Sequence, residues 1–218
     1  MTPAETLAGP AEIDVQRGVL APPWQSRVMA DSLDRPAWLT AREPIVGASD
    51  AAKLVKMSSI ETYLNAKLKP STFSGNRYTE SGNEWEPIML AWAGIPQNTL
   101  LIHSADHPGL AATPDGLLVK PEGIVLSEVK AKHDRIVYGP TPGEFRQVAF
   151  QQYCVGPEVL YTEFIWAEIV KGEMRTEVPK SLRIYPADVA DVLAALLPIA
   201  IELSTRITAA LKFERGMP

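Results

Sequence analysis

Ile124-Val-Leu-Ser-Glu128-Val129-Lys130-Ala131 is the most informative stretch of this sequence. The residues before Glu128 are so apolar that they are typical of a central strand covered on both faces, not of an exposed edge. Because side chains alternate along a strand, Glu128 and Lys130 project from one face and Val129 from the other. Charge is costly to bury, so this pair indicates either a functional site or a simple ion pair on a solvated face.

A second carboxylate comes from the turn just upstream, Thr113-Pro114-Asp115-Gly116. Pro-Asp-Gly is ordinary turn chemistry, and a plain hairpin turn is the alternative interpretation. If the strand after this turn pairs with Ile124–Ser127, however, Asp115 comes close to Glu128 at the same end of the sheet. Two carboxylates and Lys130 then meet at one point, which suits a hard cation such as Mg²⁺ that takes oxygen ligands.

A predicted helix over residues 82–93 offers a further carboxylate, from Glu84 or Glu86. These residues are two positions apart and cannot share a helix face, so only one can point at the same site. Clustered carboxylates repel one another without a metal ion, so we expect at least one raised carboxylate pKa. The large apolar residues of this helix are expected in the core, namely Trp85, Leu90 and Trp92.

The composition narrows the class of protein. The chain has 218 residues, with 21 Lys and Arg against 26 Asp and Glu and a formal net charge of −5. Hydrophobic residues at 46% and charged residues at 22% exclude collagen-like, coiled-coil and wholly disordered chains. The negative charge argues against a strongly basic protein that coats nucleic acid. The single cysteine, Cys154, excludes an intramolecular disulfide, and no apolar run is long enough for a membrane span.

Local patterns predict the order of elements along the chain. Residues 1–24 have no sustained apolar period and are expected to form a flexible N-terminal arm, and residues 25–218 a single domain. The remaining order of helices, short strands, a helix, a hairpin and a final helix predicts an α+β (mixed α/β) fold with one central sheet flanked by helices. Expected helices cover 37–42, 50–56 with Ser49 as N-cap, 60–68, 143–155 and 187–211; expected strands cover 99–103, 109–113, 117–119, 124–131, 159–170 and 174–184, the last two turning at Lys171-Gly172.

Taken in order, these residues resemble the signature of PD-(D/E)xK nucleases, and more narrowly that of phage lambda-type alkaline exonucleases and YqaJ-like viral recombination nucleases. Upstream, the stretch from Trp38 to Ala52 is similar to the family's opening motif, in which a tryptophan and an arginine precede a Gly-Ala-Ser-Asp-like segment. Downstream, residues 147–156 resemble the family's glutamine-bearing helix. The resemblance implies a central mixed β-sheet with the restriction-endonuclease-like core of that superfamily.

The resemblance also implies roles for individual residues. Asp115 and Glu128 match the metal-binding carboxylates, the backbone carbonyl of Val129 adds a ligand, and Glu86 matches the helix-borne glutamate. Lys130 matches the lysine that orients or activates the attacking water. The residues that match the 5′-phosphate pocket and the helix glutamine near the site are Arg42, Ser49, and either Gln147 or Gln151. The two glutamines share a helix face, although their spacing departs from the family's usual Gln-x-Gln form.

The implied activity is that of a Mg²⁺-dependent 5′-to-3′ exonuclease. It would degrade one strand of linear double-stranded DNA from 5′-phosphorylated ends and leave 3′ overhangs for recombination by single-strand annealing. Two Mg²⁺ ions per site, which Mn²⁺ could replace, would neutralise the phosphate and lower the pKa of bound water. The implied partners are DNA ends and a single-strand annealing protein, and the implied assembly is a homotrimeric ring. The implied setting is the cytoplasm of a bacterial host, with a phage or prophage origin.

Other functions remain open at this stage. The same core could serve an endonuclease or a single-strand nuclease, although a pocket for a 5′-phosphate would then have no use. A non-catalytic scaffold that binds DNA ends would not need the full set of carboxylates and Lys130. The net charge of −5 does not exclude DNA, since a locally basic channel is sufficient. The basic residues expected nearest the DNA are Arg42, Lys130, Lys132 and Arg135.

Overall fold

The computed structural model of the chain describes residues 23–69 and 77–214. Most of the arm predicted for residues 1–24 lies outside the described residues. The described chain enters through a short 3-10 helix, η1 (Trp24–Arg27), and ends with the long helix α6 (Ala190–Glu214). Within the described residues, no helix combines the length and the apolar character that crossing a membrane would require.

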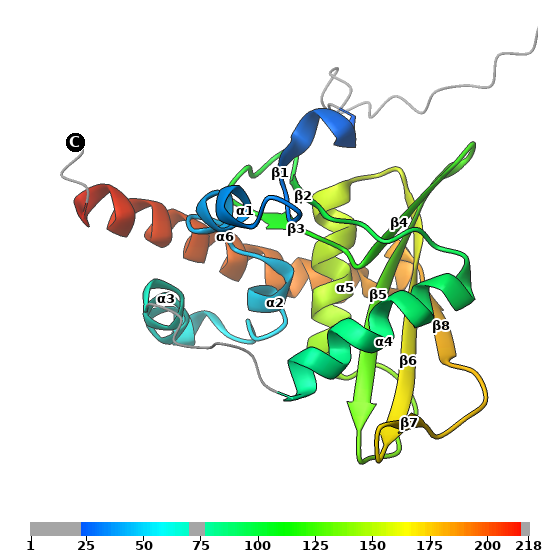
Figure 1. Cartoon of the computed structure of the whole chain (residues 1–218). Helices are drawn as coiled ribbons and strands as arrows, with labels where there is room; N and C mark the ends of the chain where they lie inside the picture. The colour runs from blue at the N-terminus through cyan, green and yellow to red at the C-terminus, as the bar shows by residue number, and fades with distance from the viewer. Residues whose placement is uncertain (1–22, 70–76, 215–218) are drawn as a thin grey trace, which may run out of the picture.

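A five-stranded mixed sheet forms the centre of the molecule (Figure 1). Its strands run in the order β4-β5-β6-β7, and β8 also pairs with β6. β5 and β6 are parallel, whereas the other pairs are antiparallel. The strands are β4 (Gly116–Lys120), β5 (Gly123–His133), β6 (Val159–Val170), β7 (Glu173–Met174) and β8 (Lys180–Ile184).

A second, smaller sheet departs from the expected single sheet. It consists of β1 (Val28–Asp31), β2 (Leu100–His103) and β3 (Ala111–Ala112) in that order. The strand predicted for residues 109–113 shortens to β3, because Leu110 pairs instead with Val46 in an isolated parallel bridge. This bridge joins the segment before Ala48 to the small sheet.

β5, which carries Glu128 and Lys130, lies between β4 and β6 in the sheet, as its apolar sequence predicts. β4 pairs with β5 in the expected register, from Gly116 opposite Ser127 to Lys120 opposite Gly123. The parallel partner β6 requires a crossover connection, and helix α5 (Pro142–Val155) provides it. The predicted turn at Lys171-Gly172 is also confirmed, since both residues have positive φ, 56° and 86°, as a type I′ hairpin turn requires.

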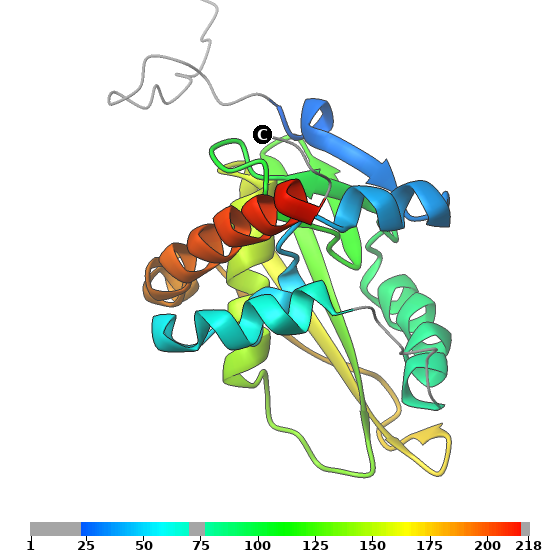
Figure 2. The ribbon, with the colours of Figure 1, turned by 90° about the vertical axis from the view of Figure 1, so that its left-hand side faces the viewer.

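Helices cover both faces of this sheet, with α4 (Arg77–Ala93) on one side and α5 on the other (Figure 2). Val125 and Val129 of β5 pack with Met89 of α4, whereas Leu126 packs with Val155 of α5. The even-numbered side chains of β5 therefore face α5. α6, which follows the 3-10 helix η3 (Pro186–Val189), packs against the outer side of α5.

The N-terminal helices differ from the predicted ones in one functional detail. They are α1 (Arg35–Arg42), α2 (Ala48–Ala51), η2 (Met57–Ser59) and α3 (Ile60–Leu68). The prediction of a helix over residues 50–56 with Ser49 as N-cap is wrong. The observed helix, α2, spans Ala48–Ala51, and its N-cap is Gly47. The carboxylate of Asp50 accepts a hydrogen bond from the Gly47 N–H at 2.9 Å and so closes the turn itself. The Ser49 hydroxyl is thereby free to serve another partner.

One expected core residue is also misplaced. Trp92, predicted to be buried, is 45% exposed near the C-terminal end of α4. Leu90 is buried as predicted, and Trp85 packs against the same cluster. The reason is the helical rotation: Met89 takes the inward position that was assigned to Trp92.

Candidate active site

Asp115 and Glu128 lie side by side at the edge where β4 begins. Asp115 directly precedes β4, and its Oδ2 accepts a hydrogen bond from the backbone N–H of Val129 at 2.7 Å. Glu128 is fully buried on β5. The hairpin register therefore brings the two carboxylates together, and this part of the sequence-based prediction is confirmed.

Glu128 is held by three donors on the α5 side of the sheet. Lys130 contacts its Oε1, and Gln147 donates to the same oxygen at 2.6 Å. Gln151 donates to Oε2 at 2.5 Å. Both glutamines thus lie at the site, and the alternative between them disappears because they stand one helical turn apart facing one carboxylate.

The position of Lys132 differs from the one expected from the sequence. It was predicted to lie near DNA, but its side chain is 5% exposed and pairs with Glu144 at the start of α5. Glu144 also accepts hydrogen bonds from Thr141, the N-cap of α5, in a capping box. The contacts of Lys132 with Glu144 and of Glu128 with Gln147 and Gln151 form one continuous strand–helix contact, which fixes α5 over β5.

Glu86 reaches the site from the opposite helix, α4. Its Oε1 accepts a hydrogen bond from Gln97 at 3.1 Å, and both residues line the same cavity as Asp115. Glu84 is exposed and does not line this cavity. Of the two alternatives that the sequence left open, Glu86 is therefore the one that faces Asp115.

The carboxylates affect one another's ionisation in the expected direction. Burial, and then the charge of Glu128, raises the pKa of Asp115 well above its usual value. Burial also raises the pKa of Glu86, to which the charge of Glu128 adds. Burial alone would lower the pKa of Lys130, but the negative charges of Glu128 and Asp115 outweigh it and raise that pKa. Lys130 lowers the pKa of both Asp115 and Glu86 and is the one described cation that does so.

These donors fit a hard divalent cation. In the described part of the chain, no group of three or more His, Cys, Asp or Glu side chains is arranged to hold a metal ion. Mg²⁺ does not need such a cage, because it is commonly bound through one or two carboxylates and keeps several waters. A carboxylate offers about four lone-pair positions, and three donors occupy Glu128. Glu128 therefore keeps about one lone-pair position, and the carboxylates of Asp115 and Glu86 line the same cavity.

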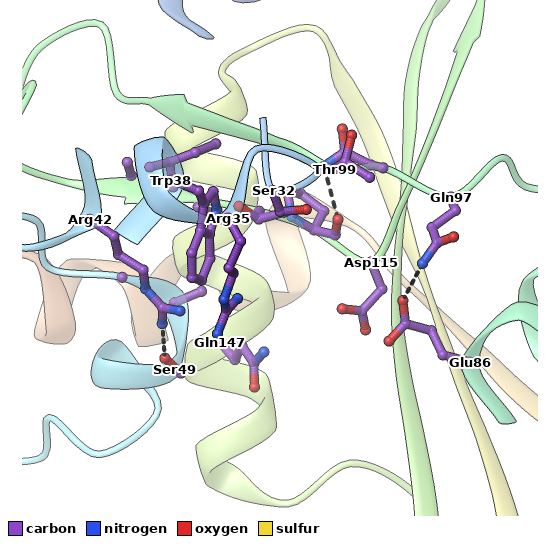
Figure 3. A pocket seen from close by; sticks show the side chains of 18 residues that line it. Ser32, Arg35, Trp38, Arg42, Ser49, Glu86, Gln97, Thr99, Asp115 and Gln147 are labelled. Atoms are coloured by element: carbon purple, nitrogen blue, oxygen red, sulfur yellow. Dashed lines mark hydrogen bonds between the residues drawn. The ribbon is translucent and has the colours of Figure 1, made fainter. Parts of the chain in front are cut away.

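One cavity of about 270 Å³ joins this acidic group to a basic wall (Figure 3). Asp115 and Glu86 lie on one side, and Arg42 and Ser49 lie on the other. Arg42 Nη2 donates to Ser49 Oγ at 2.7 Å, which uses the hydroxyl that the Gly47 cap leaves free. Burial lowers the pKa of Arg42, and the nearby charge of Asp50 partly restores it. The cavity can thus hold an anion and a cation next to each other.

Several lining residues were not found from the sequence, and Arg35 and Gln97 are the two that matter most for the site. Arg35, at the first position of α1, and Gln97, after α4, both line the cavity. The spacing of Arg35, Trp38 and Arg42 is i, i+3 and i+7, which places all three on one helix face. This helical spacing in the sequence would have been sufficient to place Arg35 beside Arg42. Gln97 carries no such signal, because its position depends on how the loop after α4 returns to the sheet.

Comparison with known proteins identifies the fold. No family model and no curated protein matches the sequence. The structure is similar to an alkaline exonuclease (LHK-Exo) from Laribacter hongkongensis, at 20% identity and a TM-score of 0.58, over 83% of this chain and 98% of that chain. A structure of LHK-Exo in complex with dAMP gives a TM-score of 0.54.

A phage-related exonuclease from Haemophilus somnus 129PT is also similar, at 13% identity and a TM-score of 0.51, over 74% of this chain and 87% of that chain. At these identities the similarity establishes a shared fold. The expected fold class, a mixed β-sheet flanked by helices, is therefore confirmed.

Proposed function

We propose that this protein is a Mg²⁺-dependent DNA exonuclease that degrades one strand of linear duplex DNA from its 5′-phosphorylated end. Three observations support the proposal. Asp115, Glu86, Arg42 and Ser49 line one cavity, Lys130 contacts the strand-borne Glu128 next to Asp115, and the structures that share the fold are named exonucleases. The single cavity carries the most weight, since a nuclease that acts at strand ends must bind a terminal phosphate and a scissile phosphate close together.

Each residue has a task that follows from its surroundings. Asp115, Glu128, Glu86 and the backbone carbonyl of Val129 would hold Mg²⁺, or Mn²⁺ in its place, as two ions per site. When bound, these ions neutralise the phosphodiester and lower the pKa of the attacking water. Lys130, kept protonated by its acidic neighbours, orients that water and stabilises the charge that develops on the phosphate.

The remaining site residues either hold Glu128 in place or bind the terminal phosphate. Gln147 and Gln151 hold Glu128 by both oxygens, so that its free lone pair is directed consistently. Arg42 and Ser49 bind the terminal phosphate, and Arg42 is held for this by its hydrogen bond to Ser49. The distance from this pocket to the carboxylates would then set where the strand is cut.

The wider biological role rests on the resemblance of the sequence motifs. Production of 3′ overhangs, delivery to a single-strand annealing protein and assembly into a homotrimeric ring stay predictions. An endonuclease acting on the same core is the alternative that the assay must distinguish.

The test is a digestion assay with three DNA substrates and Mg²⁺ or EDTA. Linear duplexes carry either a 5′-phosphate or a 5′-hydroxyl, and the third substrate is a closed circle. We expect digestion of the 5′-phosphorylated linear duplex, slower digestion of the 5′-hydroxyl duplex, and none of the circle or in EDTA. Lys130→Met should abolish digestion and leave DNA binding intact, and Lys171→Met, on an exposed turn away from the cavity, should behave as wild type. Digestion of the circle, or full activity of Lys130→Met, would refute the proposal.

A further inference from the structure

Two arginines enclose a tryptophan on the basic wall of the cavity. The guanidinium carbon of Arg35 lies 4.6 Å from the ring centroid of Trp38, and that of Arg42 lies 4.7 Å from it. Figure 3 shows the Trp38 indole between the two arginine side chains, both of which line the cavity. Stacking on a buried aromatic ring fixes the plane of a guanidinium group. Both cationic groups are therefore oriented before any ligand binds.

Asp50, the carboxylate that acts on Arg42, offsets only part of the effect of burial on the pKa of that arginine. Arg42 donates to the uncharged Ser49, and the nearest carboxylate, Asp50, already accepts hydrogen bonds from Lys67 at 2.8 Å and from the Gly47 N–H at 2.9 Å. Arg35 forms no ion pair with any residue in the described part of the chain. Burial lowers the pKa of Arg42, the charge of Asp50 raises it, and the charge of Arg35 lowers it by a smaller amount. Two guanidinium groups thus line one cavity, where an anion can contact both.

The position of Arg35 in α1 is unfavourable for the helix itself. It occupies the first helical position, next to the N-cap Asp34, where the positive end of the helix dipole disfavours a cation. The same arginine in the last turn would stabilise the helix, as Arg42 does. Helix stability therefore does not account for this arginine, whereas its place on the cavity wall does.

The chemical difference between a strand end and the strand interior matches this arrangement. A phosphomonoester carries about −1.5 to −2 charges at pH 7, because its second pKa is about 6. An internal phosphodiester carries one charge. A single arginine and a serine suit either group, whereas two oriented guanidinium groups suit the dianion.

We propose that Arg35 is a specificity-determining residue, the second cation of a two-arginine subsite that selects the dianionic 5′-phosphomonoester over a monoanionic phosphodiester. This inference rests on the proposed function, because it concerns the same cavity. In it Arg42 and Ser49 bind the terminal phosphate, and Arg35 adds the contact that only a dianion can use fully. Trp38 holds the two guanidinium groups apart and in place.

The test measures binding, not cleavage. Fluorescently labelled duplexes end in a 5′-phosphate, in the methyl ester of that phosphate, which carries one charge, or in a 5′-hydroxyl. Their affinities are measured in EDTA at fixed salt for the full chain and for Arg35→Gln, Arg35→Lys and Arg42→Gln. The matched control is Arg183→Gln, because Arg183 also stacks on an aromatic ring, Tyr161 at 4.9 Å, but lies outside the cavity.

Wild type should bind the phosphate end more tightly than the methyl ester, and the methyl ester more tightly than the hydroxyl. Arg35→Gln should reduce the phosphate-to-ester ratio roughly tenfold and leave the ester-to-hydroxyl ratio unchanged, whereas Arg42→Gln should reduce both. Arg35→Lys should keep part of the ratio, and Arg183→Gln all of it. Lowering the pH below about 6 should shrink the wild-type ratio, since the dianionic monoester then takes up one proton and becomes a monoanion.

Two results would overturn the inference: an unchanged phosphate-to-ester ratio in Arg35→Gln, or an equal loss of affinity for all three ends. If wild type distinguishes the ends but Arg35→Gln retains the ratio, the inference fails and the proposed function stands. If wild type does not distinguish phosphate from hydroxyl, the end-recognition part of the proposed function fails as well, and the inference with it.

Discussion

Replacing Lys132 with methionine should destabilise the protein without weakening its binding to DNA. Lys132 projects from β5 on the same face as Lys130, yet its side chain is 5% exposed and pairs with Glu144, whose side chain is 13% exposed. Methionine has a similar length and no charge. The substitution therefore removes the ion pair while leaving the space filled.

The size of the effect follows from what Glu144 retains. A hydrogen bond to a charged group contributes about 1.5–3 kcal/mol to stability, and breaking a fully buried ion pair costs about 3–5 kcal/mol. Glu144 keeps its hydrogen bonds to Thr141 at 2.8 Å and 3.0 Å and some contact with solvent, so the lower range applies. In a chain of this size, 1 kcal/mol moves the Tm by about 2–4 °C, and the expected fall is about 3–12 °C.

The pH dependence gives a second check. Burial alone would raise the pKa of Glu144, but its hydrogen bonds with Lys132 and Thr141 lower it below its ordinary value. A carboxyl group with a depressed pKa in the folded state stabilises the protein above its unfolded pKa, about 4.3 for glutamate, and loses that contribution as the pH falls through the depressed value. The difference in stability between wild type and Lys132→Met should therefore be constant near neutral pH and close in acid.

Urea unfolding and salt-dependent DNA binding measure the two sides of this prediction. The double substitution Lys132→Met with Glu144→Gln should recover most of the lost stability, since no uncompensated charge remains. Lys171→Met is the surface control. The reasoning is refuted if Lys132→Met unfolds like wild type and instead lowers the salt dependence of DNA binding by about one phosphate contact.

Three further substitutions test the acidic side of the cavity. Asp115→Asn should abolish Mg²⁺-dependent cleavage yet raise the Tm in EDTA, because a carboxyl with a raised pKa loses stability as the pH rises through that pKa; the gain should grow from about pH 4 upward, and a lower Tm than wild type at pH 8 would contradict it. Gln151→Leu should slow cleavage roughly 10- to 100-fold but change stability by less than about 1 kcal/mol in urea unfolding, because the lost hydrogen bond to Glu128 is offset by removal of the buried Oε1, which has no partner in the structure. Glu86→Gln should weaken the Mg²⁺ dependence of cleavage roughly 10- to 100-fold in a metal titration, whereas the matched Glu84→Gln should have no effect, and equal effects would disprove the assignment.

The parts of the site that the sequence predicted are those set by short-range pairing. The Asp115 and Glu128 contact depends on a hairpin whose two strands are joined by a tight turn, so alternation and register were sufficient. The same is true of the α5 glutamines, because residues four apart share a helix face. In both cases the local geometry of the strand pair or helix determines which side chains lie together.

The parts that were missed depend on how elements rotate and pack. Lys132 has the same strand alternation as Lys130, and only the placement of α5 decides which of them reaches solvent. Ser49 lost its capping role because Asp50 closed the turn instead. Trp92 is exposed because α4 turns Met89 inward. Each outcome is a competition between neighbours of similar propensity, which tertiary contacts decide.

The strand–helix contact also determines how this site can move. Glu128 is hydrogen-bonded to two glutamines of α5, and α5 is the crossover that allows β5 and β6 to lie parallel. The acidic side of the cavity thus belongs to the same cooperative unit as the core of the fold. Amide hydrogens of Glu128 and its strand neighbours should exchange only when the whole protein unfolds. Such a site is built before its ligand arrives, and little of the binding free energy is spent on ordering it.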